Sequence, residues 1–248
     1  MTERSGDWKE HRTDFPLDNE PAWRGEPFAL PLPNATMRAS SSVADLDSWY
    51  AIGEAWAQIA SRFLPPDPTV LDLGCGCGKM ARFLYVNPGL RYVGVDIFLP
   101  AILWCRENFA RLAGDRFRFE HFDGVSEIYN PSGTIRPIDY RLPVDDASID
   151  LSICASLFTH LLEPECCHYL LELYRVAKPG GKALVSIHNE PPPGQRYAGD
   201  HARIDIDEGY FNELAGAAGL VATAVVGNVY GQQVLLFERP PEARRDDG

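Results

Sequence analysis

The 248-residue sequence lacks the signals that would send it to a membrane or out of the cell. It has no run of about 18 uncharged apolar residues, the length that a membrane-spanning helix needs. Residues 1–12 are polar and include acidic side chains, so they lack the apolar core of a secretory signal. These two absences predict a cytoplasmic protein that makes no contact with a membrane.

Clusters of basic residues are also scarce. Lys and Arg stand side by side only at Arg244 and Arg245, and the formal net charge is −12. Proteins that bind nucleic acid usually present a basic face, because neutralising phosphates supplies most of the affinity. The composition therefore disfavours nucleic acid as a substrate or partner.

The six cysteines do not follow a metal-binding spacing. Only one residue separates Cys75 from Cys77, and the adjacent Cys166 and Cys167 fall on a predicted helix, where they point in different directions. A structural zinc site takes cysteines two to four residues apart, with a second pair or histidines downstream. We expect reduced cysteines in core and turn positions, and no metal.

Residues 70–80, V-L-D-L-G-C-G-C-G-K-M, carry the strongest motif. The apolar run leads into Gly74, Gly76 and Gly78, which predicts a strand that enters a tight turn. Open α/β sheets bind nucleotide-like cofactors at such a turn. The G-x-G-x-G spacing differs from the G-x-G-x-x-G of dinucleotide sites, and Asp72 would repel a pyrophosphate but suit a cationic ligand.

A second acidic residue follows the next predicted strand. Residues 92–97 form a buried apolar run that contains Asp96, which lies 22 residues after Gly74. A carboxylate at the tip of the second strand can accept hydrogen bonds from both ribose hydroxyls of an adenosine. The sequence therefore predicts that Asp96, with Ile97 beside it, binds the ribose of the cofactor.

These segments resemble the class I S-adenosylmethionine-dependent methyltransferases. The glycine segment is similar to the first motif of that family, and four further segments follow in the family's order, at residues 92–97, 117–124, 148–160 and 172–182. The resemblance implies an α/β fold: a Rossmann-like, doubly wound, mostly parallel seven-stranded sheet with an antiparallel final strand and helices on both faces. It also implies S-adenosylmethionine as the cofactor.

The resemblance also assigns roles to single residues. Asp123 takes the place of an acid near the adenine amino group, while Asp72 either binds the methionine ammonium through water or braces the loop. The predicted cofactor-binding residues are Asp72, Gly74, Gly76, Gly78, Asp96, Ile97 and Asp123.

Two shorter motifs resemble a bacterial subset of that family which methylates small molecules and glycans. Residues 129–133 read Y-N-P-S-G inside an irregular stretch from 126 to 142, and residues 158–160 read F-T-H after the fourth strand. A long loop in a compact α/β protein is typical of a binding role. We expect a small-molecule or glycan-like acceptor, with oxygen as the favoured acceptor atom.

Two histidines are candidates for a general base. His160 follows the fourth strand and His188 ends the fifth, and ligands bind at this edge of the sheet. A neutral imidazole can accept a hydroxyl proton near pH 7. The alternative for His160 is that it packs at the start of the next helix and only shapes the pocket.

The composition divides the chain into three parts. Residues 1–42 hold five prolines among charged residues and predict an irregular arm, residues 43–239 form the methyltransferase domain, and residues 240–248 form a disordered tail. Inside the domain, the helix expected over 47–63 could bring Trp49 or Tyr50 to the pocket. The proline-rich stretch from 191 to about 205 is expected to be irregular.

Two other functions remain open. A catalytically silent partner protein that binds S-adenosylmethionine would carry the same cofactor motif. An NAD(P)-dependent oxidoreductase would explain the sheet and Asp96, but neither the glycine spacing nor the antiparallel pair of strands expected at the end of the chain.

Overall fold

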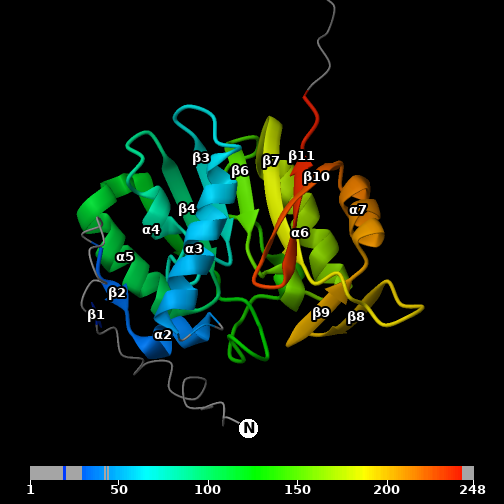
Figure 1. The fold of residues 1–248 in the computed structure, drawn as a ribbon, viewed down its shortest axis with the longest axis horizontal. Helices are drawn as coiled ribbons and strands as arrows, with labels where there is room; N and C mark the ends of the chain where they lie inside the picture. Colours follow the sequence, from blue (N-terminus) through cyan, green and yellow to red (C-terminus); the bar gives the residue numbers. More distant parts are fainter. Residues whose placement is uncertain (1–18, 21–29, 42, 44, 242–248) are drawn as a thin grey trace, which may run out of the picture.

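The computed structural model describes residues 19–20, 30–41, 43 and 45–241, and its centre is a seven-stranded sheet (Figure 1). The strands follow the order β10-β11-β7-β6-β3-β4-β5, and all pairs are parallel except those that β11 makes with β10 and β7. This is the predicted sheet, antiparallel final strand included. Its strands are β3 (Thr69–Leu73), β4 (Arg91–Asp96), β5 (Phe117–His121), β6 (Ile149–Cys154), β7 (Ala177–Ile187), β10 (Val221–Val229) and β11 (Gln232–Glu238).

Helices cover both faces of this sheet. In Figure 1, α3 crosses in front of the strands and α6 lies behind them. The helix after the glycine loop is short, because residues 77–80 form turns. The five helices around the sheet are α3 (Leu46–Ser61), α4 (Ala81–Leu84), α5 (Leu99–Ala113), α6 (Glu163–Val176) and α7 (Glu208–Ala217).

Side chains that alternate along the strands divide the core into two clusters. On β3, Val70 packs with residues of α3, α4 and α5, whereas Leu71 and Leu73 pack with residues of α6 and α7. Successive side chains of a strand point to opposite faces, so a strand covered on both faces reads as a continuous apolar run. Strand β3 is therefore covered on both faces. Its carboxyl end, and the glycine loop that follows it, lie at the edge of the sheet.

The prediction of an irregular arm over residues 1–42 is wrong for its described part. Residues 19–20 and 32–33 pair as β1 and β2, and α2 (Ala35–Ser40) begins at Asn34, whose side chain accepts a hydrogen bond from Met37 N. Leu30 and Met37 are fully buried in the cluster that contains α3. Residues 30–41 therefore belong to the domain, because their apolar side chains add to its core. The aromatic residues Trp8, Phe15, Trp23 and Phe28 of the arm lie outside the described residues.

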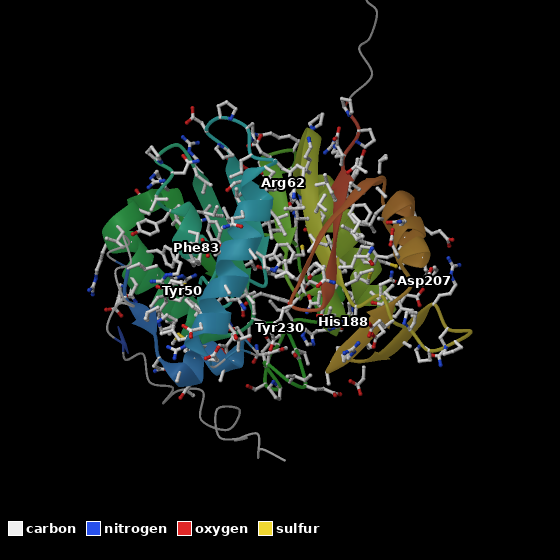
Figure 2. All side chains as sticks on the ribbon, in the orientation of Figure 1. Tyr50, Arg62, Phe83, His188, Asp207 and Tyr230 are labelled. Atoms are coloured by element: carbon white, nitrogen blue, oxygen red, sulfur yellow. The ribbon has the colours of Figure 1, made fainter. Side chains whose placement is uncertain are left out.

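Arg82 holds this segment in place. Its side chain is fully buried and its Nη2 donates hydrogen bonds to the carbonyl oxygens of Leu30, at 2.8 Å, and Pro31, at 3.2 Å. The guanidinium also lies over the rings of Trp49 and Tyr50. Figure 2 labels Tyr50 on α3, with Phe83 of α4 beside it at a centroid distance of 5.8 Å. The two α3 aromatics therefore face α4 and the amino-terminal segment.

The second irregular stretch contains a hairpin that the sequence analysis missed. Strands β8 (Tyr197–Asp200) and β9 (Arg203–Ile206) pair antiparallel and project at the lower right of Figure 1. The prolines end at Pro193, and Ile204 and Ile206 alternate into the core. Gly199 has a φ of +114°, and a Cβ there would overlap the carbonyl of Arg203, so the hairpin requires glycine at this position.

Two further expectations concern the membrane and the end of the chain. Within the described residues, no helix is long and apolar enough to cross a membrane. The predicted disordered tail lies, from residue 242 onward, outside the described residues.

Replacing Arg82 with Met should lower the free energy of unfolding by about 2–3 kcal/mol, because two buried carbonyls lose a charged donor. Chemical denaturation of the two proteins measures this difference. Arg111→Met is the matched control, since Arg111 is exposed on α5 and forms a surface ion pair with Glu107. That change should stay within about 0.5 kcal/mol. Equal effects of the two substitutions would contradict the role given to Arg82.

Candidate functional site

One large cavity opens at the carboxyl ends of β3, β4 and β6, which is where open α/β sheets bind ligands. It encloses about 1460 Å³ of empty space, counting the part open to solvent. The glycine loop and the ends of β3 and β4 line one half, which we call the cofactor half. Residues from the 122–137 segment, η3 (Phe158–His160), α6 and the β8–β9 turn line the other, which we call the acceptor half.

The glycine loop adopts the predicted tight turn. Gly74, Gly76 and Gly78 all have positive φ, at +85°, +52° and +73°. At Gly78 a Cβ would also lie 2.8 Å from the ring of Phe109 on α5, so packing excludes any larger residue there. The N–H of Gly74 is held by the carbonyl of Val95 at 2.8 Å, which ties the loop to the end of β4.

Helix α3 borders the cavity with other residues than the sequence predicted. Ile52, Gly53 and Trp56 line it, whereas Trp49 and Tyr50 do not. A Cβ at Gly53 would overlap the carbonyl of Lys79, so glycine allows the helix to approach the loop closely.

Asp96 lies in the cofactor half, with Ile97 next to it. One carboxylate oxygen accepts a hydrogen bond from Gly76 N and the other from Phe98 N, both at 2.7 Å. Burial raises the pKa of this carboxyl above its usual value, and the two backbone hydrogen bonds oppose that rise. Each oxygen keeps a further lone pair, so the arrangement is compatible with the predicted ribose contact.

Asp72 lies deeper in the same half and is buried. The hydroxyl of Tyr92 donates a hydrogen bond to its carboxylate. Burial raises the pKa of Asp72 to about 7, against the effect of Tyr92 and of the Lys79 ammonium. Burial also lowers the pKa of Lys79, which the sequence analysis did not single out. The two residues place a carboxyl group and an amine at one end of the cavity.

Asp123 does not line the cavity. Its carboxylate accepts hydrogen bonds from Asn130 Nδ2 at 2.9 Å and Thr134 Oγ1 at 2.8 Å, and these bonds lower its pKa. It lies beyond the end of β5 at His121, not at the strand terminus that the sequence suggested. The contact with adenine stays a prediction, and in this structure Asp123 holds the Y-N-P-S-G turn together.

His160 ends η3 and lines the acceptor half. Its Nδ1 lies 2.9 Å from the carbonyl oxygen of His201, and the ring of Tyr129 contacts it edge-on at a centroid distance of 5.7 Å. Burial lowers the pKa of His160, so the imidazole is neutral near pH 7. Glu165 and Tyr169 of α6 lie in the same half.

His188 lies elsewhere. It follows β7 at the edge where the parallel strands end (Figure 2), but it does not line the cavity. Its carbonyl accepts a hydrogen bond from Ile206 N at 2.7 Å, which joins β7 to the hairpin, and burial lowers the pKa of its ring. The structure therefore brings only one of the two predicted histidines to the cavity.

The polar residues of the cavity that the sequence did not predict include Lys79, Glu165, Tyr169 and His201. Glu165 carries a local signal, since it lies in the first turn of α6 and accepts a hydrogen bond from Leu162 N at 2.8 Å. Nothing near His201 in the sequence indicates that a hairpin brings it next to His160.

Comparison with known proteins finds similarity to methyltransferases. Residues 71–185 match a family model described as a methyltransferase domain. The chain is 28% identical over 134 residues to a tRNA (carboxymethyluridine(34)-5-O)-methyltransferase of Arabidopsis thaliana, covering 53% of this chain and 27% of that protein. It is 32% identical over 126 residues to a demethylmenaquinone methyltransferase of Thermus thermophilus, covering 50% and 49%. The chain thus spans half or less of the length of these curated relatives.

Solved structures share the fold. A 1,6-didemethyltoxoflavin-N1-methyltransferase of Burkholderia thailandensis, with bound 1,6-didemethyltoxoflavin and S-adenosylhomocysteine, superposes with a TM-score of 0.59. It is 20% identical, and the match covers 90% of this chain and 94% of that one. At this identity the likeness establishes the fold.

The raised pKa of Asp72 makes stability depend on pH. Between pH 3.8 and about 7 the folded protein keeps a proton on Asp72 that the unfolded chain releases, so stability should fall as pH rises through this window. Relative to Asp72→Asn, the wild type should lose up to about 1.4 kcal/mol per pH unit there. Denaturation at several pH values measures the difference, with the exposed Asp115→Asn as the control. Parallel curves for wild type and Asp72→Asn would contradict the burial effect.

Proposed function

We propose that this chain, whose residues 71–185 form a class I S-adenosylmethionine-dependent methyltransferase domain, transfers the methyl group of that cofactor to a hydroxyl of a small-molecule or glycan-like acceptor. One observation carries the proposal. The cavity that contains the glycine loop and Asp96 also contains a neutral histidine, His160, on its acceptor side.

The residues of the cofactor half fit the chemistry of S-adenosylmethionine. Asp96 would accept the ribose hydroxyls, while Asp72 and Lys79 would face the ammonium and carboxylate of the methionine part. Two carboxyl groups, buried at Asp72 and half-buried at Asp96, and a single lysine suit a sulfonium cation better than a pyrophosphate. The bound cofactor would supply an already activated methyl group, so the protein has to align the acceptor and exclude water.

The hydrogen bond of His160 supports a role for this residue as the general base. A carbonyl oxygen can only accept, so the 2.9 Å contact with His201 requires the proton on Nδ1 of His160. The neutral ring then carries its lone pair on Nε2. The bound cofactor would supply the activated methyl group and keep the sulfur–methyl electron pair as the acceptor oxygen takes the methyl, and Nε2 of His160 would take the hydroxyl proton. A base is needed most by a weakly acidic hydroxyl, which supports oxygen as the acceptor atom.

The acceptor half supports a small hydroxylated acceptor. The rings of Tyr129 and Tyr169 supply apolar faces against which a small acceptor could pack. The Burkholderia relative binds a small molecule, whereas the Arabidopsis relative is a tRNA methyltransferase. The net charge of −12 and the scarcity of basic clusters favour the first kind of substrate for this chain.

Calorimetric titration should show micromolar binding of S-adenosylmethionine and S-adenosylhomocysteine. Asp96→Asn should weaken both by about tenfold or more, because a charged acceptor is lost, while the exposed Asp115→Asn should bind as the wild type does. Absence of heat for either ligand from a folded sample would contradict the proposed cofactor. A titration with NAD(H) and NADP(H) would then test the oxidoreductase alternative.

His160→Asn should lower kcat for hydroxylated acceptors by about 10²–10⁴-fold without changing the affinity for S-adenosylmethionine. His188→Asn is the matched comparison, because it removes the other predicted base from outside the cavity. Formation of S-adenosylhomocysteine with a panel of sugars and phenols measures both. Because burial lowers the pKa of His160, the loss of activity at acid pH should occur at a lower pH than a solvent-exposed histidine base would give. Unchanged kcat in His160→Asn would contradict its role, and a silent binding protein would show no turnover with any acceptor.

A further inference from the structure

A group of polar residues beside His160 has no part in the reaction proposed above. Glu165 comes from the first turn of α6, and His201 comes from the turn between β8 and β9. Both line the acceptor half of the cavity. Glu165 is nearly buried, with 13% of its side chain exposed, and His201 is 27% exposed.

Three hydrogen bonds tie the hairpin to the short segment 160–165. The hydroxyl of Tyr197 donates to the carbonyl of Leu161 at 2.6 Å. Nδ1 of His160 contacts the carbonyl of His201 at 2.9 Å, and Nε2 of His201 lies 3.3 Å from Oε2 of Glu165. These bonds attach the hairpin to His160 and to Leu161 and Glu165, which follow it in the chain, so the hairpin does more than cover the cavity.

Glu165 connects the two elements. Its Oε2 accepts from the backbone N–H of Leu162 at 2.8 Å as well as contacting the ring of His201. Oε2 of Glu165 thus contacts both the backbone at the start of α6, two residues after His160, and the β8–β9 turn. The carbonyl of His201 in that turn faces Nδ1 of His160. The position of that carbonyl therefore depends on the side chains of both Glu165 and His201.

We propose that Glu165 and His201 form a positioning unit, in which the tethered tip of the β8–β9 hairpin keeps the proton of His160 on Nδ1 and leaves Nε2 as the base. This inference rests on the proposed function, because it takes His160 as the proton acceptor. Glu165 and His201 are positioning residues here, since they act through His160.

The physical reason is tautomer selection. A neutral imidazole carries its proton on either nitrogen, and only the Nδ1–H form has a lone pair on Nε2. A fixed carbonyl opposite Nδ1 favours that form, whereas a mobile turn would allow both. The titratable groups around His160 are Tyr129 from the 126–142 segment, Glu165 from α6, His188 after β7 and His201 from the hairpin.

Nitrogen NMR of the full chain, labelled at histidine, tests the proposal without turnover. In the wild type the His160 signal, assigned with His160→Asn, should show a protonated Nδ1 and an unprotonated Nε2. In Glu165→Ala and His201→Ala a substantial fraction should carry the proton on Nε2, and kcat should fall by about tenfold with KM for the acceptor unchanged. Glu165→Gln keeps an acceptor oxygen for both donors, so it should restore the wild-type spectrum and rate.

Gln195→Ala is the matched control, because Gln195 is an exposed residue just ahead of the same hairpin. His201→Ala leaves the start of α6 intact, so it tests the proposal even if Glu165→Ala fails to fold. A wild-type tautomer in His201→Ala, or a protonated Nε2 in the wild type, would overturn the proposal. A shifted tautomer with unchanged kcat would support the positioning unit and contradict His160 as the base.

Discussion

The two hydrogen bonds that Asp96 accepts from backbone N–H groups are the constraint on which the site depends. They join the glycine loop, through Gly76, to the start of α5, through Phe98. The N–H of Gly74 in the loop also donates a hydrogen bond to the carbonyl of Val95, so these bonds join the ends of β3 and β4. The carboxylate of Asp96 that holds the loop also lines the cavity, so one residue serves both the loop geometry and the expected ribose contact.

The acceptor side is built differently, from elements that follow the sheet strands without belonging to them. His160 lies between β6 and α6, and the carbonyl that orients it comes from a hairpin more than forty residues later in the chain, at His201. In this arrangement the cofactor half depends on backbone geometry within the first two sheet strands. The acceptor half depends on how a separate hairpin docks, which allows it to vary without disturbing the cofactor half.

The amino-terminal segment shows why composition alone misleads. Prolines and charges predicted an irregular arm, yet residues 30–41 include α2 and bury Leu30 and Met37. The partner that orders this segment is Arg82, whose donors satisfy two arm carbonyls. A buried arginine far along the chain leaves no local signal near residue 30, so only the assembled core shows that the segment belongs to the domain.

The sequence by itself determined the glycine turn and the place of Asp72 and Asp96 near strand ends, because apolar runs and glycine spacing are local properties of the chain. The sheet and its antiparallel final strand followed from the resemblance of five ordered segments to a known family. Tertiary structure alone decided that His160 lines the cavity and His188 does not, that Asp123 holds a loop, and that Glu165 and His201 meet. These outcomes depend on side chains from segments far apart in sequence, and contacts between such segments are set by packing of the whole core.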